Sequence, residues 1–347
     1  MSPVTDLDAE RDVRQRLGAV PGVVRYVLPV QWIVRSIVTF NQFRPAHLSQ
    51  RMADLCAFVT SQENACRYCY GSTRAFLRLT GMSEGALSAF ERDLQLAEAS
   101  DADLALLDFC RKLAQSNPRP ARPAYDKLRA MGVSDAAVRE ASFLVVVTCV
   151  ANRVATILGV PADLDLEGLP DKPLVRAFRP IVVWAAMRMA KPARRPAGAR
   201  AYTGPYAKVL RVLGDSPWAL HLGDALDAMF ETGALGRRAS LLVFAVVARG
   251  LGCELCEDEA CRQLRADGLG DDELTRIVTL LDSPSLTPTE RAVIELARNT
   301  VRYEASGIQD HARALAAEVG RDLTIEAVGV AGMANAVVRL AMLHDCQ

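Results

Sequence analysis

The sequence has no excess of charge of either sign, since lysine plus arginine and aspartate plus glutamate each number 41 in 347 residues. A balanced chain creates no long-range field for a polyanion, so we expect no nucleic-acid partner. Uninterrupted apolar runs are short as well. Pro180–Met187 and Leu241–Ala248 span eight residues each, whereas a membrane helix needs about 20.

The first 17 residues, MSPVTDLDAERDVRQRL, lack the apolar stretch of a secretory signal, so we expect a cytoplasmic protein. Structural disulfides are rare in the cytoplasm, so the nine cysteines are expected to be thiols, redox groups or metal ligands. Half of the residues are hydrophobic and 24% are charged, which is typical of a globular protein. The length suggests two domains.

The chain repeats itself with an offset of about 187 residues. Two Cys-x-x-Cys pairs, Cys66 to Cys69 and Cys253 to Cys256, stand 187 residues apart. Further features recur at nearly the same offset: Trp32 and Trp218, the helix-start signals at Ser100 and Thr287, Glu140 and Glu326, and Arg153 and Arg339. Similarity at a fixed offset over about 130 residues indicates two copies of one unit.

Both units are predicted to be all-α, because apolar residues recur with helical period and strict alternation is scarce. Such stripes include Leu104, Leu107, Phe109 and Leu113 in the first half, and Val293, Leu296 and Val301 in the second. We expect four segments: an N-terminal extension (1–19), a first helical repeat (20–160), a linker (161–204) and a second helical repeat (205–347). The repeats are expected to pack about a pseudo-two-fold axis.

The linker combines an apolar stretch, Ile181–Ala190, with a basic cluster. The basic residues are Arg188, Lys191, Arg194, Arg195 and Arg200, beside Trp184. A membrane-surface helix and a linker helix that packs on one repeat both fit this pattern. We favour the second interpretation and expect no membrane contact, because a membrane-surface helix usually has a longer amphipathic face.

A Cys-x-x-Cys pair at a helix start is suited to thiol chemistry. With Asn64 as the expected N-cap, Cys66 and Cys69 fall in the first turn, where unpaired N–H groups stabilise a thiolate. Residues at i and i+3 are neighbours, so one thiol can attack and the other resolve. A shared zinc site is disfavoured because zinc pairs are typically about 12–20 residues apart, and we expect no metal. A third interpretation is that the pairs are relics in a fold kept for its packing.

The segment Ala65-Cys66-Arg67-Tyr68-Cys69 and the capped helices after it resemble the alkylhydroperoxidase D-like, or carboxymuconolactone decarboxylase-like, family. The resemblance covers both repeats and implies an all-α fold, a tandem duplicate of one protomer, homo-oligomers and no cofactor. Redox members of that family share a motif that consists, in chain order, of a glutamate, eleven intervening residues, the Cys-x-x-Cys pair, three intervening residues and a histidine. The resemblance makes Cys69 the attacking thiol and Cys66 the resolving thiol.

The proton-relay residues of that motif are altered in the first copy and absent from the second. In the first copy the glutamate position is Asp54 and the histidine position is Thr73. In the second copy, whose dithiol is Cys253 and Cys256, these positions are Leu241 and Ala260. His47 and Glu63 are possible accessory proton acceptors near the first pair, although both also fit as ordinary surface residues.

Local charge ranks the first pair above the second. Glu63, Arg67 and Arg74 sum to +1 around the first pair, while the residues around Cys253 and Cys256 sum to −3. Because positive neighbours favour thiolate, the thiol of Cys69 is expected to have a lower pKa than the thiols of the second pair.

The leading interpretation is a cytoplasmic dithiol protein with peroxidase (peroxiredoxin-type, antioxidant) or disulfide-reductase activity. Its expected partners are a small peroxide or disulfide substrate and an unidentified thiol reductant. The alternatives are a catalytically degenerate helical binding or oligomerisation module, favoured by the missing histidine, and a decarboxylase-like lyase. The paired cysteines argue against the lyase, because that branch of the family lacks them.

Overall fold

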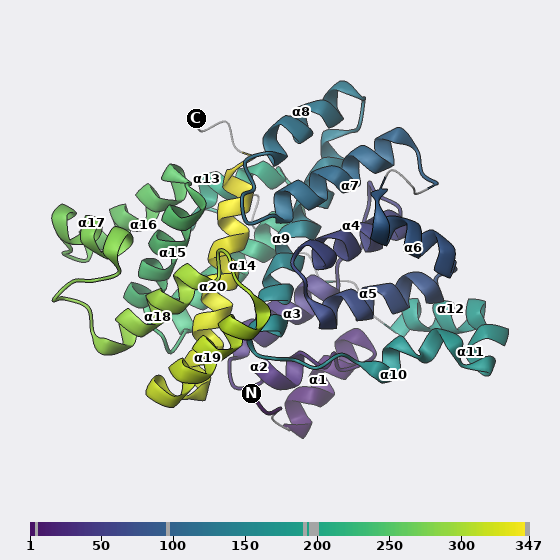
Figure 1. Cartoon of the computed structure of the whole chain (residues 1–347), viewed down its shortest axis with the longest axis horizontal. Coiled ribbons are helices and arrows are strands. Elements are labelled where there is room, and N and C mark those ends of the chain that lie inside the picture. The colour runs from purple at the N-terminus through teal and green to yellow at the C-terminus, as the bar shows by residue number, and fades with distance from the viewer. Residues whose placement is uncertain (4–5, 95–97, 190–192, 194–200, 344–347) are drawn as a thin grey trace.

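The structure is a computed structural model that describes residues 1–3, 6–94, 98–189, 193 and 201–343, with side chains left out for 186–189. Every regular element in these residues is a helix, so the all-α prediction is confirmed (Figure 1). The predicted basic cluster runs from Arg188 to Arg200. It lies outside the residues whose side chains the structure describes, as does Cys346.

The first half contains α1 (Leu7–Leu17), α2 (Val24–Val27), α3 (Gln31–Asn41), α4 (Gln50–Glu63), α5 (Arg67–Leu79), α6 (Glu84–Arg92), α7 (Asp101–Ala114), α8 (Ala121–Ala130) and α9 (Asp135–Ile157). The linker region carries α10 (Leu164–Glu167), the 3₁₀ turn η2 (Leu169–Asp171), α11 (Pro173–Ala177) and α12 (Arg179–Met189). The second half contains α13 (Ala207–Leu210), η3 (Arg211–Leu213), α14 (Pro217–Thr232), α15 (Arg237–Leu251), α16 (Glu254–Ala266), α17 (Asp271–Leu280), α18 (Pro288–Asn299), α19 (Ala305–Val319) and α20 (Arg321–Ala341).

The sequence repeat has a counterpart in the order of the helices. Helix α4 begins at Gln50 and α15 at Arg237, and α5 begins at Arg67 and α16 at Glu254, each pair 187 residues apart. The predicted helix-start signals form as expected. Ser100 caps α7, and Thr287 caps α18 in a full capping box with Glu290. The domain boundaries and the pseudo-two-fold axis remain predictions.

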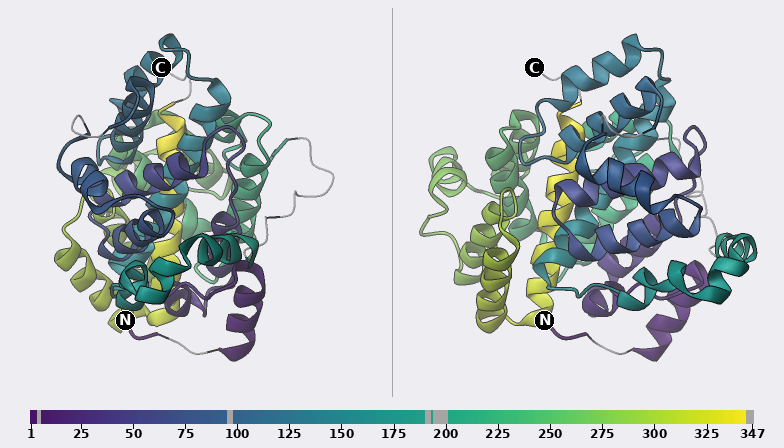
Figure 2. Two further views of the ribbon diagram at one scale, coloured as in Figure 1. Left: turned by 90° about the vertical axis from the view of Figure 1, so that its right-hand side faces the viewer. Right: turned by 45° about the vertical axis from the view of Figure 1, so that its right-hand side comes forward.

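Helices α9 and α20 form the centre of the molecule and pack along each other (Figures 1 and 2). Both are apolar and almost entirely buried, because neighbouring helices of the two halves surround them. By length and composition either helix is able to cross a membrane, but 89% and 94% of their most apolar windows are buried inside the protein. That burial is typical of a core helix, and one continuous hydrophobic cluster joins the two halves.

The recurring tryptophans contact the opposite half of the chain. Trp32 of α3 donates a hydrogen bond from Nε1 to the Glu326 carboxylate of α20, at 3.2 Å. Trp218 of α14 packs on Phe143 of α9, with 5.1 Å between ring centroids. Helices α3 and α14 also pack on each other. The repeated residues therefore hold the halves together through reciprocal contacts.

Candidate functional site: two dithiols at helix starts

The first dithiol lies at the junction between α4 and α5. Asn64 is the C-cap of α4, and Ala65 takes a left-handed conformation (φ +49°) that turns the chain. The Cys66 amide then donates to the Ser61 carbonyl at 3.0 Å, which closes the end of α4 as in a Schellman motif. The turn makes Cys66 the N-cap of α5. The expectation that Asn64 is the N-cap was therefore wrong.

The sulfur of Cys66 occupies the place of a capping oxygen. The Cys69 backbone N–H donates to Cys66 Sγ at 3.4 Å, so the sulfur faces the positive end of the α5 dipole. Cys66 is 1% exposed, whereas Cys69 is half-buried. All eight cysteines in the described residues are free thiols.

The two thiols of the first pair differ in acidity. A hydrogen bond from the Cys69 thiol lowers the pKa of Cys66 to about 7. The nearby polar groups of Thr156, the Cys69 N–H and Asn152 lower it further, while burial opposes the shift. The pKa of Cys69 is raised well above its ordinary value by its hydrogen bond to Cys66 and by burial. Cys69, which was expected to be an acidic thiol, is therefore the less acidic of the two.

Two polar residues of α9 complete this site, and the sequence analysis missed both. The Asn152 side chain donates to Ser61 Oγ at 3.1 Å and accepts from the Asn64 side chain at 3.2 Å. The buried Thr156 hydroxyl forms no hydrogen bond of good geometry and lies near Cys66 and the equally unpartnered hydroxyl of Tyr303. The signal in the sequence was the presence of polar residues inside an otherwise apolar helix. A search limited to residues near the cysteines and histidines in the sequence does not detect it.

The second dithiol has the same backbone setting and a less polar environment. Gly252 supplies the left-handed residue (φ +70°), and Cys253 is the N-cap of α16. A hydrogen bond from the Cys256 thiol lowers the pKa of Cys253, whereas burial and the nearby Glu257 raise it. At an offset of 186 residues, Val338 and Met342 stand where Asn152 and Thr156 stand in the first half. The second pair therefore lacks the polar groups of the first.

The carboxylates predicted near the first pair show no interaction with its thiols in the described residues. Asp54 accepts a hydrogen bond from the Gln50 side chain at 3.0 Å. Burial raises the pKa of Asp54 to about 6, and neither cysteine contributes to that shift. Glu63 is the last residue of α4 and is exposed.

Thr73 and His47 have structural roles. The Thr73 hydroxyl donates to the Cys69 carbonyl at 2.8 Å, one turn earlier in the helix, as threonine hydroxyls inside helices often do. His47 precedes α4, since that helix begins only at Gln50, and its side chain is exposed. Its backbone N–H donates to Glu140 at 2.9 Å.

The arginines expected to favour a thiolate are held in ion pairs. Arg67 binds Glu167 through two hydrogen bonds of 2.6 Å, and Arg74 binds Glu91 at 2.7 Å. Neither arginine contributes to the pKa shift of Cys66. The first pair is therefore distinguished by the polar side chains of α9 near it and not by local charge.

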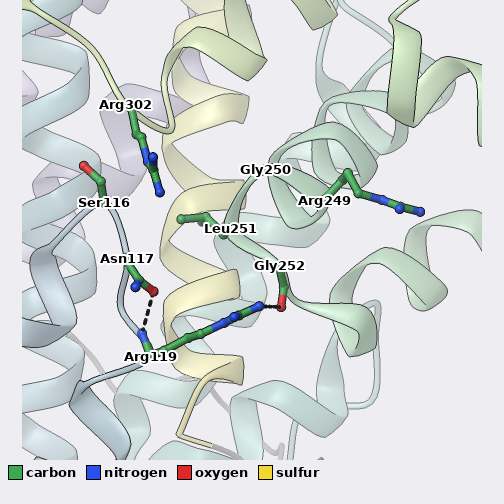
Figure 3. A pocket seen from close by; sticks show the side chains of 8 residues that line it. All are labelled: Ser116, Asn117, Arg119, Arg249, Gly250, Leu251, Gly252 and Arg302. Carbon is green, nitrogen blue, oxygen red and sulfur yellow. Dashed lines mark hydrogen bonds between the residues drawn. The ribbon is translucent and has the colours of Figure 1, made fainter.

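A cavity of about 300 Å³ lies beside the second dithiol, between the two halves. Its lining comprises Ser116, Asn117, Arg119, Arg249, Gly250, Leu251, Gly252 and Arg302. Figure 3 shows Arg302 pointing into it from one side, while Arg119 crosses its base towards the Gly252 carbonyl and Arg249 points away. None of these described lining residues is acidic.

No group of three or more potential ligands among the described residues is placed to hold a metal ion. Searches of protein-family models, curated proteins and solved structures gave no match to this chain. The resemblance to the alkylhydroperoxidase D-like family thus rests on the sequence motif alone.

Proposed function

We propose that the protein is a thiol-dependent oxidoreductase whose reactive dithiol is Cys66 and Cys69. The observation that carries the proposal is the Cys66 sulfur at the N-cap of α5, bonded by the Cys69 N–H and flanked by polar side chains of α9. A thiolate held at neutral pH is the form that attacks a peroxide or a disulfide.

The reaction needs only the two thiols and a thiol reductant. A thiolate attacks one oxygen of a peroxide, the O–O bond breaks, and the leaving oxygen takes a proton to give an alcohol or water. The resulting sulfenic acid condenses with the second thiol, releases water and forms a Cys66–Cys69 disulfide. An external dithiol, or two external thiols, then reduces the disulfide through a mixed disulfide, which restores both cysteine thiols and leaves the reductant as a disulfide.

The environment favours Cys66 as the thiolate, whereas the family resemblance assigns the attack to Cys69. The favoured thiol is deeply buried, so a small peroxide fits this site better than a protein disulfide. Because Thr73 stands at the histidine position of the motif, we expect slow turnover, since general acid–base assistance typically contributes about 10²–10⁴-fold.

The test is peroxide consumption with a dithiol reductant, followed by peptide mapping of oxidised cysteines. We expect a Cys66–Cys69 disulfide in the wild type and loss of turnover in both Cys66→Ser and Cys69→Ser. Sulfenic acid trapped at Cys66 in Cys69→Ser identifies Cys66 as the attacking thiol, and trapping only at Cys69 in Cys66→Ser supports the resemblance. The matched control is Cys253→Ser, which should retain activity. Equal inactivity of the wild type and both variants refutes the proposal.

A second candidate function is the binding of a small anion in the cavity beside Gly252. Its support is the pair of guanidinium groups of Arg119 and Arg302 in a space with no acidic lining residue. Guanidinium groups bind carboxylate and phosphate oxygens in a forked geometry. Calorimetric titration with phosphate and with citrate, using Arg302→Gln and the exposed-site control Arg35→Gln, tests this function. Binding that is absent, or unchanged in Arg302→Gln, refutes it.

A further inference from the structure

Helices α11 and α12 project from the body of the protein (Figures 1 and 2). Several of their large apolar side chains are exposed. Leu174, Phe178, Ile181 and Trp184 are 75%, 54%, 60% and 59% exposed. These four account for almost half of the large exposed hydrophobic residues in the described chain. An exposed apolar group of this kind marks an interaction surface more often than a chance arrangement.

The four side chains, called the apolar stripe below, follow one another along α11, the junction residue Phe178 and α12. Their spacings of four, three and three residues match the helical period in the sequence. Phe178 separates the two helices, and its backbone (φ −110°, ψ +22°) lies outside the helical range. The helical period therefore holds within each helix and not across the junction.

Positive charge accompanies this stripe. Lys172, Arg176 and Arg179 are exposed and form no ion pair within the described residues. The sequence from Lys172 to Trp184 contains no acidic residue. Asp171, just before it, is bound by Arg78 at 2.6 Å. In a chain with no net charge, this segment therefore has a local excess of three positive charges.

We propose that the α11–α12 surface, formed by these seven residues, binds the headgroup region of an anionic lipid bilayer. Apolar side chains with a tryptophan enter the interface, and basic groups beside them pair with lipid phosphates. A second copy of this chain is the less suitable occupant. A two-fold contact through this surface sets Lys172, Arg176 and Arg179 against the same residues of the other copy.

This interpretation replaces the packed linker helix favoured from the sequence. The sequence of an apolar helical segment does not show whether its side chains are covered or exposed. The exposed fractions in the structure therefore decide between the two interpretations. The proposal is independent of the dithiol, which lies on other helices.

The test is co-sedimentation of the full-length protein with phosphatidylcholine vesicles, with and without phosphatidylglycerol. We expect binding to the anionic vesicles and binding weaker by on the order of 100-fold to the neutral ones, from about fivefold per basic residue. The double variant Arg176→Gln/Arg179→Gln should bind anionic vesicles about 25-fold more weakly. Added salt should weaken the binding of the wild type.

The apolar stripe is tested by Phe178→Ser/Trp184→Ser, which should lose at least about tenfold in vesicle affinity. The matched control is Leu280→Ser, because Leu280 is 66% exposed on a different helix. Its vesicle binding should equal that of the wild type. The proposal is overturned by absent vesicle binding, or by equal binding of all variants. It is also overturned if sedimentation velocity shows a dimer that Phe178→Ser/Trp184→Ser dissociates while no vesicles are bound.

Discussion

The acidity of Cys66 provides a quantitative test of the site. A pKa of about 7 in place of the ordinary 9.0 favours the thiolate by about 3 kcal/mol. At pH 7 about half of Cys66 is then thiolate, against about 1% for an unperturbed thiol. The main cause is the hydrogen bond from the Cys69 thiol. Cys69→Ala removes this donor and should move the midpoint of Cys66 upward, towards 9.

The assay is the pH profile of iodoacetamide labelling, read for each cysteine by peptide mapping. The midpoint of the profile reports acidity even where burial slows the absolute rate, because access scales the whole curve. We expect a midpoint near pH 7 for Cys66 in the wild type. Cys69 should be labelled only at pH values above the ordinary pKa of a cysteine thiol. The midpoint of its profile should fall in Cys66→Ala, because this variant removes the main cause of the raised pKa of Cys69.

Two results would refute this reasoning. A wild-type midpoint of Cys66 near 9 means that burial outweighs the hydrogen bonds. A midpoint near 7 that is unchanged in Cys69→Ala means that the backbone N–H and the α9 side chains lower the pKa and the Cys69 thiol does not. Cys253 is the internal reference. Its pKa is lowered without help from α20 side chains, and its midpoint should not respond to either variant of the first pair.

Three further predictions concern stability, each measured by urea unfolding. Ala65→Gly relieves a left-handed alanine and should raise the free energy of unfolding by about 0.5–1 kcal/mol. The same change at Ala314, inside α19, should lower the free energy of unfolding by about 1 kcal/mol. Changes of the same sign in the two variants contradict the strain argument. Gly329→Ala should cost about 1–3 kcal/mol, because a Cβ there meets Ile33 at 2.4 Å, while Gly85→Ala, in open space, should stabilise by about 0.4–1 kcal/mol. Asp54→Asn should stabilise at pH 7.5 and not at pH 4, because the raised pKa means that the folded state loses stability as pH rises from about 4 to 6; a gain that is equal at both pH values contradicts it.

Local patterns were sufficient to predict the helices and the position of the dithiols. The period of the apolar residues indicates helices, and Thr287 with Glu290 marks a helix start that forms as predicted. The cap of α5 was misassigned because the chain turns at Ala65. Alanine seldom adopts the left-handed conformation, so its identity gives no signal for such a turn.

The surroundings of the dithiol depend on contacts between distant parts of the chain. Asn152 and Thr156 lie almost 90 residues after Cys66, and Tyr303 belongs to the other half. Periodicity places residues on a helix face but does not specify which distant helix covers that face. Local charge was misleading for the same reason, since Glu167 and Glu91 neutralise Arg67 and Arg74 only in the folded chain.

The buried arginines explain why the two halves depend on each other. Arg153 and Arg339 are 2% and 0% exposed and form no ion pair within the described residues. Instead, Arg153 donates to the Thr300 carbonyl at 3.2 Å and Arg339 to the Gln115 carbonyl at 3.0 Å. Thr300 and Gln115 cap the C-termini of α18 and α7, where the helix dipole is negative. Each half thus supplies the acceptor for the buried charge of the other.

Burial and the neighbouring Arg153 lower the pKa of Arg339 to about 9, so its guanidinium remains charged at neutral pH. A half separated from its partner would leave a charged guanidinium without these acceptors, at a cost of several kcal/mol if it stayed buried. The same separation would remove Tyr303, whose ring lies 6.0 Å from Arg153 and whose hydroxyl lies near Thr156 beside Cys66. The polar environment of the first dithiol is therefore a property of the two halves together, which places the proposed chemistry at their junction and not within one repeat.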